Sequence, residues 1–134
     1  MPLLNRRKTN LPEGPVEYPV GTFLSSPSGY YFIHSSDKRL KIISKRCLDS
    51  WAPVRVVETS NEALSKYRIY SKLKFRNGSL LHSFADGRLY LVVEGHRRPI
   101  VSPDVLTKIG AHIKDAISVS LVELELHPLG DELT

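Results

Sequence analysis

The chain is short of the features that stabilise a small exported protein or anchor one in a membrane. It contains one cysteine, Cys47, so no intrachain disulfide can form. No stretch approaches the ~20 consecutive apolar residues of a membrane-spanning helix. The N-terminus carries Arg6, Arg7 and Lys8, but no apolar core follows them, and the pattern is not that of a secretory signal. We therefore expect neither a membrane partner nor export through a signal of its own.

The sequence also has few residues arranged for catalysis or metal binding. Its five histidines form no i, i+4 pair, and no second cysteine is available for a zinc site. Neither a Gly-x-Ser-x-Gly motif nor a glycine-rich phosphate loop is present. A Ser–His–Asp triad stays open on residue counts alone, but N-capping explains the notable serines, which are Ser44, Ser60, Ser102 and Ser120. We predict that the protein is not an enzyme and holds no cofactor or metal.

The chain does contain an internal sequence repeat. Residues from about 20 to 69 and from 77 to 133 align as two diverged copies. The segments that carry the alignment are 21–25, 31–33, 41–44 and 59–64 in the first copy, and 78–82, 90–92, 99–102 and 119–124 in the second. A short internal repeat is typical of a structural module duplicated for packing or multivalent binding. Features that both copies share are therefore interpreted as structural, and features of one copy as local.

The pattern within each copy predicts a small unit of mixed secondary structure. Residues 30–34 and 89–93 have the composition and alternation of strands, and turn residues separate them from the next strand. Residues 102–104, Ser-Pro-Asp, predict the start of a helix. We predict an α+β fold of two tandem units, 20–71 and 72–134, each a ~3-stranded antiparallel sheet with two short helices.

An extended N-terminal arm, residues 1–19, is expected to precede the two units. Its four prolines disfavour helix and favour extended backbone, while Arg6, Arg7 and Lys8 make it basic. By composition alone the arm is typical of a disordered tail. If it is ordered, we expect a neighbouring chain to hold it in place.

The second copy resembles a known module. The resemblance rests on the string from Leu89 to Ile100, on Ser102-Pro103-Asp104-Val105 and Ile109-Gly110, and on Val119-Ser120, Glu123-Leu124 and His127-Pro128-Leu129-Gly130. It is similar to a roughly 50-residue repeat of secreted actinobacterial cell-surface proteins. That repeat often stands beside peptidoglycan hydrolase domains, and similar repeats occur in structural proteins of phages that infect such bacteria. The match covers about residues 73–133; in the first copy Ala52 replaces Gly110 and the Pro-Leu-Gly ending is missing.

The resemblance implies a non-catalytic role in an assembly or at a cell surface. Because the chain shows no export signal and a virion component needs none, we expect a phage structural protein, an accessory or minor tail component or a capsid-associated one. It would act through protein–protein contacts with other virion proteins, in multiple copies within a symmetric assembly. The alternative is a cell-wall module that binds an anionic polymer at the cell surface. A second alternative is a small nucleic-acid-binding protein.

Basic residues are the best candidates for partner contacts. The net charge of +5 and the isoelectric point of about 9.4 suit an anionic partner. The arm and the clusters that follow the second turn of each copy give nine candidates: Arg6, Arg7, Lys8, Lys38, Arg39, Lys41, His96, Arg97 and Arg98. The alternative explanation is a solvated hairpin end, or charges that protect an edge strand. Nucleic acid is a less favoured partner, because the aromatic residues within the basic segment 66–76 fit an alternating strand that turns Ile69 inward.

Overall fold

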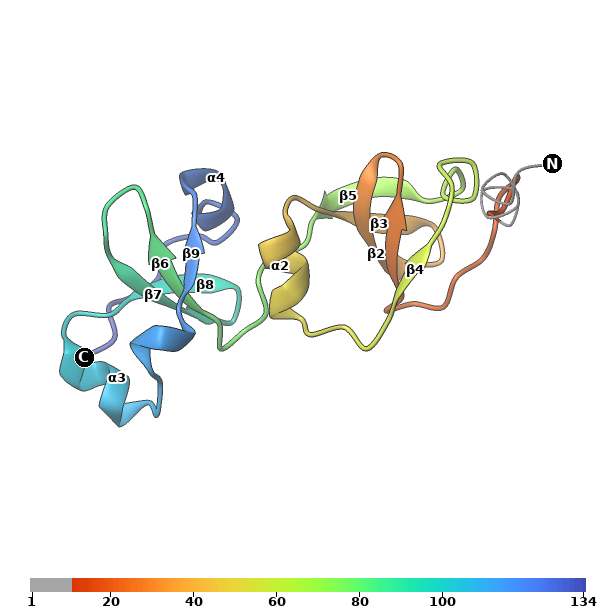
Figure 1. Ribbon diagram of the computed structural model, residues 1–134. Helices are drawn as coiled ribbons and strands as arrows, with labels where there is room; N and C mark the ends of the chain where they lie inside the picture. The colour runs from red at the N-terminus through yellow and green to blue at the C-terminus, as the bar shows by residue number, and fades with distance from the viewer. Residues whose placement is uncertain (1–10) are drawn as a thin grey trace. The chain divides into compact units, whose positions relative to one another are not determined.

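A computed structural model describes residues 11–134, and the chain divides into two compact units (Figure 1). Unit 1 contains the described residues up to Lys45 together with Pro53–Leu73. Unit 2 contains Arg46–Ala52 and Lys74–Thr134. The short helix α2 (Lys45–Ser50) therefore lies in the sequence of the first copy, yet nearly all of it folds as part of unit 2.

Unit 1 is built on a five-stranded mixed sheet in the order β4-β1-β2-β3-β5. The strands are β1 (Phe23–Ser26), β2 (Gly29–Ser35), β3 (Lys38–Ile42), β4 (Val56–Glu58) and β5 (Arg68–Lys72). The three central strands form antiparallel hairpins, and the two outer strands pair in parallel with β1 and β3. One face of the sheet packs against the turns that precede β5, and the buried core there consists of Leu24, Tyr31, Ile33, Leu64 and Tyr67.

Unit 2 contains a four-stranded mixed sheet in the order β8-β7-β6-β9. The strands are β6 (Leu80–Ser83), β7 (Leu89–Val93), β8 (His96–Pro99) and β9 (Ile117–Val119). Its further helices are α3 (Pro103–Lys108), the 3-10 turn η1 (Ile113–Asp115) and α4 (Leu121–Leu124). The last segment of the chain adds two isolated parallel bridges beside β8, from Arg97 to Leu129 and from Ile100 to Leu133.

The two units have the same connectivity. Along each copy of the sequence, three strands form two antiparallel hairpins, a helix follows, a parallel strand joins the first strand, and the final segment runs parallel to the third. In the first copy that helix is α2, which belongs to unit 2. Leu24 pairs with Tyr31 as Leu81 pairs with Tyr90, so Tyr90 corresponds to Tyr31. The two copies can therefore be compared position by position.

The structure contradicts the predicted α+β fold of three-stranded antiparallel sheets. The described chain is mostly sheet, with mixed sheets of five and four strands and three short α-helices. The additional strands, β4, β5 and β9, pair in parallel with strands distant in sequence, and such pairing leaves no local hairpin signal. The helix predicted after Ser60 is also wrong: residues 61–66 form turns. Ala63 stands there in place of Glu123, so the reciprocal cap that starts α4 cannot form.

Local residues explain where the helices begin and end. At the start of α4, Glu123 N–H donates to the Ser120 hydroxyl, and Ser120 N–H donates to the Glu123 carboxylate. Helix α3 begins at Pro103 and is followed by Gly110, which has a φ of +71°. Ala52 occupies the same place after α2 with a φ of +44°, in the left-handed region that favours glycine.

Residues 11–19 of the predicted arm pack along unit 1. Val16 N–H donates to the carbonyl of Ala63 at 3.1 Å, and Tyr18 N–H donates to the Tyr67 hydroxyl at 2.8 Å. The Tyr18 hydroxyl lies 2.6 Å from that of Thr59. Unit 1 itself thus supplies, for these residues, the contact that we expected from a neighbouring chain. Residues 1–10 lie outside the described residues.

Candidate functional site

Two of the predicted contact residues, Arg39 and Arg97, have the same structural role in the two units. Arg39 Nη1 donates to the carbonyl of Leu64 at 3.2 Å, and Arg97 Nη1 donates to the equivalent carbonyl of Leu124 at 3.1 Å. Each guanidinium also lies over the tyrosine of the second strand, 4.5 and 5.8 Å from the ring centroid. Both arginines therefore tie the third strand to the turn or helix that follows the parallel strand, which is a scaffold role shared by the copies.

Most of the other described candidates are held by nearby backbone. Lys41 Nζ donates to the carbonyl of Ser28, in the turn between β1 and β2, at 2.9 Å, and it approaches Gly29 so closely that a Cβ there would lie 2.3 Å from it. Arg98 Nε donates to a carbonyl near the C-terminus at 2.8 Å, and His96 Nδ1 lies 3.1 Å from a carbonyl of its own turn. Among the described candidates, Lys38 differs from these, because its ammonium group lies over the ring of Tyr70. The three candidates in the arm lie outside the described residues: Arg6, Arg7 and Lys8.

Lys38 belongs to a group of side chains that gather around Tyr70 in unit 1. The rings of Tyr70 and His34 are stacked, with centroids 5.5 Å apart and planes 12° from parallel. Lys38 Nζ lies 4.7 Å from the centroid of the Tyr70 ring, and the central guanidinium carbon of Arg68 lies 5.6 Å from it. We call His34, Lys38, Arg68 and Tyr70 the Tyr70 cluster.

The position of β5 in the sheet creates this cluster. As the outermost strand it is exposed at all five residues, including Ile69, which we wrongly expected to turn inward. Arg68 lies beside Lys38 in the parallel register of β5 with β3. Tyr70 is the extra residue of a register shift, because Ile69 pairs with Arg39 and the next pairing skips Tyr70. A bulge of this kind re-aims a side chain, here towards the exposed face of an edge strand.

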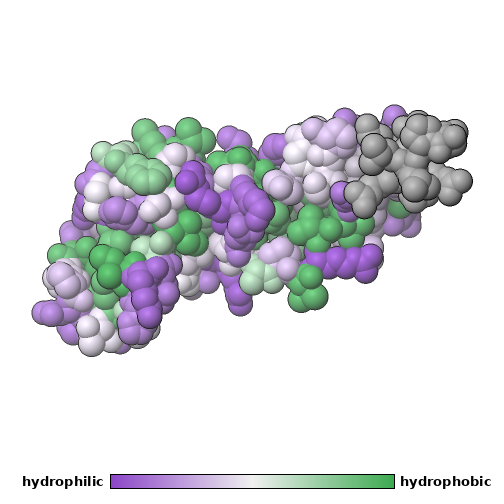
Figure 2. All heavy atoms as spheres, in the orientation of Figure 1, coloured by the Kyte–Doolittle hydropathy of each residue, from purple (hydrophilic) through white to green (hydrophobic). Residues whose placement is uncertain are grey.

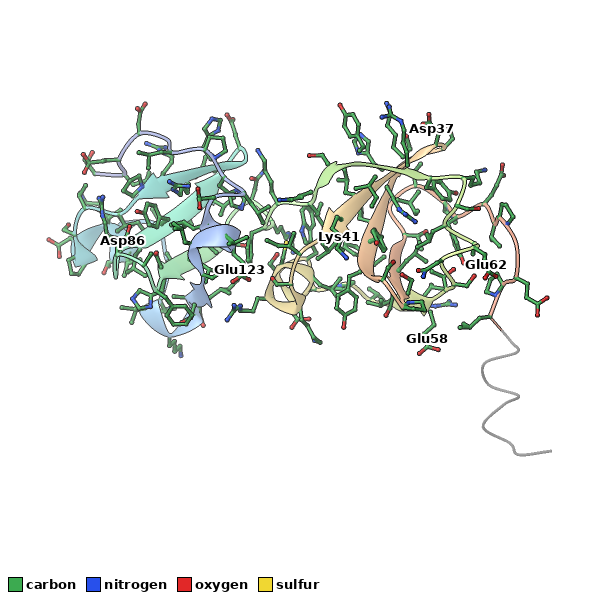
Figure 3. All side chains as sticks on the ribbon, turned by 90° about the horizontal axis from the view of Figure 1, so that it is seen from above. Asp37, Lys41, Glu58, Glu62, Asp86 and Glu123 are labelled. Atoms are coloured by element: carbon green, nitrogen blue, oxygen red, sulfur yellow. The ribbon has the colours of Figure 1, made fainter. Side chains whose placement is uncertain are left out.

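The unit that carries the cluster has a positive net charge. Among the described residues, eight Lys and Arg against five Asp and Glu give unit 1 a formal charge of +3, whereas eight against nine give unit 2 a charge of −1. The adjoining turn holds one acid, Asp37, whose carboxylate accepts from the Ser35 hydroxyl at 3.1 Å. Figure 3 shows Glu58 and Glu62 well away from that turn. The basic excess of the described residues is thus confined to unit 1, and Asp37 is the one acid of the turn beside the cluster.

The Tyr70 cluster combines charge with an aromatic side chain, and it exists in one copy alone. Its two cations can pair with anionic groups, and the Tyr70 side chain between them is half exposed while His34 stacks on its ring. The positions of unit 2 that correspond to the four residues are Val93, His96, Pro128 and Gly130. The cluster is therefore a local feature added to a shared scaffold.

Two buried side chains of unit 2 that could be reactive, those of Cys47 and His127, have structural roles instead. Burial, together with the nearby Glu123 carboxylate, raises the pKa of Cys47 to about 12, so its thiol stays protonated. His127 Nε2 accepts from Phe75 N–H at 3.1 Å, and its Nδ1 donates to the carbonyl of Gly95 at 2.8 Å. Burial lowers the pKa of His127. Tyr67 accepts the equivalent backbone N–H in unit 1, so this histidine also serves the scaffold.

Comparison with known proteins does not assign the chain to a family. No family model matches it, and no curated protein matches it significantly. Within residues 11–134, no three His, Cys, Asp or Glu side chains come together as a metal site, and no helix is long and apolar enough to cross a membrane.

Sequence reasoning identified only Lys38 of the cluster. The signal for the others was present, because Tyr70 stands between basic residues in the segment 66–76. Alternation of faces along a half-buried strand explained that segment equally well. The missing fact was that β5 is the outermost strand, which depends on its parallel pairing with β3 and not on the local sequence.

Proposed function

We propose that the protein is a non-enzymatic binding protein whose unit 1 holds an anionic polymer, as a cell-wall binding module does. The observation that carries this proposal is the Tyr70 cluster, which places Lys38 and Arg68 on an exposed aromatic ring. The formal charge of +3 on the described residues of unit 1 supports it, because a positive field raises the local concentration of a polyanion. The tyrosine ring favours a polymer with sugar or other ring units over simple anions.

Retention on purified Gram-positive cell walls tests this function. The full-length protein should be retained at low salt and released as salt rises, because exposed charge contacts are screened. Lys38→Glu/Arg68→Glu should weaken binding by about 2 kcal/mol, more than tenfold, since each cation near an anionic surface contributes roughly 1 kcal/mol. Tyr70→Ala should also weaken binding, but it should leave the salt dependence unchanged.

A matched control separates the cluster from net charge. Lys108→Glu/Lys114→Glu changes the net charge by the same amount at two exposed residues of unit 2. We expect this control to bind almost as well as the original protein. Equal weakening by the two double variants would show that the site is not the Tyr70 cluster. Tighter binding to duplex DNA than to walls, with a steep salt slope, would favour the nucleic-acid alternative.

A second candidate function is that of an accessory virion component, and a surface of unit 2 favours it. Phe84, Leu121 and Val122 are all more than half exposed, and Figure 2 shows apolar side chains gathered over α4. Phe84 N–H donates to the carbonyl of Val119, which places Phe84 next to the start of α4. The corresponding residues of unit 1 are Pro27, Asn61 and Glu62. An apolar surface present in one copy fits a protein–protein contact within an assembly.

Particle incorporation tests this candidate. Leu121→Asn/Val122→Glu gives unit 2 the residues that unit 1 has, so the unit should still fold while losing the apolar contact. We expect this variant to be missing from purified particles, as judged by immunoblotting. Val101→Asn/Ile113→Glu alters two other exposed apolar residues of unit 2 and should be incorporated normally. Normal incorporation of the first variant would remove α4 from the assembly contact.

A further inference from the structure

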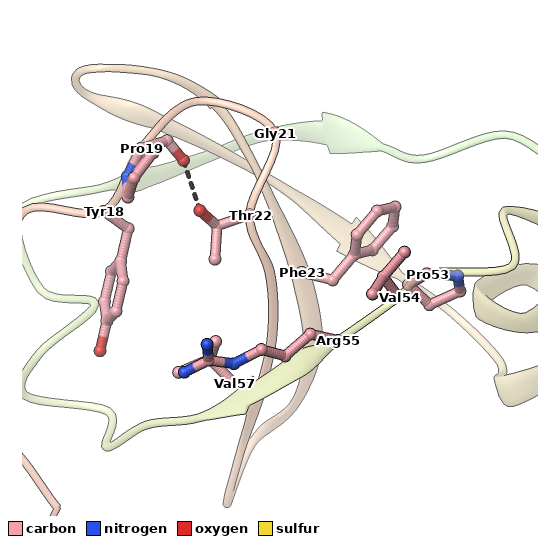
Figure 4. Close-up of a pocket in the computed structure, with 9 residues that line it drawn as sticks. All are labelled: Tyr18, Pro19, Gly21, Thr22, Phe23, Pro53, Val54, Arg55 and Val57. Carbon is pink, nitrogen blue, oxygen red and sulfur yellow. Dashed lines mark hydrogen bonds between the residues drawn. The ribbon is translucent and has the colours of Figure 1, made fainter.

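Unit 1 contains a cleft of about 610 Å³ beside the start of its first strand (Figure 4). Its lining is mostly aromatic, proline or aliphatic: Tyr18, Pro19, Phe23, Pro53 and Val57. The hydroxyl of Thr22, which also lines the cleft, is engaged by the carbonyl of Pro19 at 2.6 Å. Arg55 supplies the charged group of the lining, and its guanidinium makes no hydrogen bond or ion pair with any residue of the described chain.

Unit 2 has a cleft of about 400 Å³ at the equivalent place. Four of its lining residues correspond to residues of the first cleft by strand register: Gly78, Ser79, Leu80 and Ile117. In both units the other side of the cleft is the segment that leaves the helix and enters the parallel edge strand. Because the copies have diverged in sequence, a cavity kept in both is a product of the shared connectivity. The lining then decides what each cleft accepts.

The two linings differ in charge. The first cleft has Arg55 and no acid, whereas the second has Asp115 and His112 and no arginine or lysine. An apolar side chain of the first cleft is also uncovered, since Val54, which lines it, is fully exposed. An apolar rim around one unpaired cation suits an occupant that carries apolar groups beside an anion.

The adjoining strand β4 favours an extended occupant. It is an outermost strand of its sheet, and no strand of the described chain pairs with its far side. Edge strands of this kind accept an added peptide strand, whose backbone supplies hydrogen bonds while alternate side chains enter neighbouring pockets. Val57 belongs both to β4 and to the cleft lining, so a strand added to β4 would lie against the cleft.

We propose that unit 1 captures an extended peptide segment along β4 in which every second side chain faces the cleft, with an apolar residue and an acidic residue among these. An apolar side chain of the segment enters the cleft against Phe23 and Val57, and a carboxylate pairs with Arg55. The cleft of unit 2 rejects the same segment, because Asp115 repels its carboxylates. This site is separate from the Tyr70 cluster and goes beyond the proposed polymer binding.

Titration of the isotope-labelled full-length protein with a capped pentapeptide that has valine, aspartate and valine at its first, third and fifth positions and serine between them, followed by NMR, tests the proposal. We expect shift changes at the β4 amides and at Phe23, and none at Leu80 or Ile117. Arg55→Gln should weaken binding about tenfold, the loss of one charge-assisted hydrogen bond. Arg76→Gln, at another exposed arginine, should bind like the original protein.

Three results would overturn the assignment. Equal affinity of Arg55→Gln and the original protein would show that the cation does not select the ligand. Equal binding of the peptide with lysine in place of aspartate would show that charge does not matter. Concentration-dependent shifts at the same residues without any peptide would identify a second copy of the chain as the occupant. Because wall binding is measured with variants of the Tyr70 cluster, a failure here is distinguishable from a failure there.

Discussion

Breaking the ion pair between Arg46 and Glu123 should loosen the inserted helix α2 from the rest of unit 2. The Arg46 guanidinium donates to the Glu123 carboxylate through Nε at 3.1 Å and through Nη2 at 2.7 Å. Glu123 is only 3% exposed, and its carboxylate also accepts from Ser120 N–H at 2.9 Å. The substitution Arg46→Ala therefore leaves a buried carboxylate that keeps its bonds to Ser120 but loses both guanidinium bonds.

The cost follows from how deeply each partner is buried. Removing one member of a fully buried pair costs about 3–5 kcal/mol. The Arg46 side chain is 48% exposed, so water offsets part of the loss, and we expect Arg46→Ala to lower the free energy of unfolding by about 2 kcal/mol. Glu123→Ala also removes the cap of α4 and should cost about 3 kcal/mol. The double variant should lose less than the sum, with a coupling energy of about 1.5 kcal/mol.

Trp51 makes this measurement specific to unit 2. It is the one tryptophan of the chain, it belongs to unit 2, and its Nε1 donates to the carbonyl of Lys74 at 2.9 Å. Urea unfolding followed by its fluorescence should show Arg46→Ala with a midpoint lowered by about 1 M, for a slope of about 2 kcal/mol per molar. Lys108→Ala, at an exposed lysine of the same unit, should leave the midpoint unchanged. A coupling energy below about 0.5 kcal/mol would refute the claim that this pair docks α2.

Four further predictions concern unit 2, whose unfolding Trp51 fluorescence reports. Arg97→Ala removes the donor to the carbonyls of Leu124 and His127 and should destabilise unit 2 by about 2–3 kcal/mol, which urea midpoints check; no change in midpoint would make Arg97 a free surface residue after all. Because the pKa of His127 is lowered in the folded chain, the unfolded chain takes up its proton first: stability is complete above the ordinary value of 6.5 and falls as pH drops below it. The stability lost between pH 7 and 5 should be much smaller in His127→Gln. An unchanged loss in that variant would show that His127 does not cause the pH dependence. Ala52→Gly should stabilise unit 2 by about 0.5–1 kcal/mol, since it relieves a left-handed alanine, and a lower midpoint would contradict this. The buried thiol of Cys47 should react with a disulfide reagent only when α2 detaches, so Arg46→Ala should speed labelling; equal rates in the two proteins would argue that labelling needs global unfolding.

The part of the fold that the sequence predicts is the part made of local signals. The strong strands at 30–34 and 89–93 are β2 and β7, and the Ser-Pro-Asp start at 102–104 begins α3. The parallel strands were missed, since β4 and β9 are three residues long and pair with partners more than thirty positions away. The sequence also carries no local signal that α2 belongs to unit 2. It depends on the contact of Arg46 with Glu123, which are 77 positions apart.

The candidate site was predicted less well than the fold, and for a specific reason. Matching basic residues in the two copies were interpreted as a recurring contact surface, but Arg39 and Arg97 recur because both units need the same tie to a backbone carbonyl. A charge in the sequence does not reveal whether its partner is solvent, a ligand or the protein's own backbone. Tyr70 was set aside because edge and central strands have similar local composition, and only the register of β5 distinguishes them.

Comparison of the two copies distinguishes scaffold residues from candidate binding residues. A residue that recurs at equivalent positions, such as Arg39 and Arg97 or Tyr31 and Tyr90, is retained because the shared connectivity requires it. Selection for a partner acts on each copy separately, so a binding residue should lack a counterpart. Arg68 and Tyr70 in unit 1 correspond to Pro128 and Gly130 in unit 2. Transplanting Pro and Gly to positions 68 and 70 should therefore abolish wall binding while leaving the Trp51-monitored stability of unit 2 intact. If binding survived that exchange, unshared residues would have no claim to function, and the shared arginines would again become the candidates.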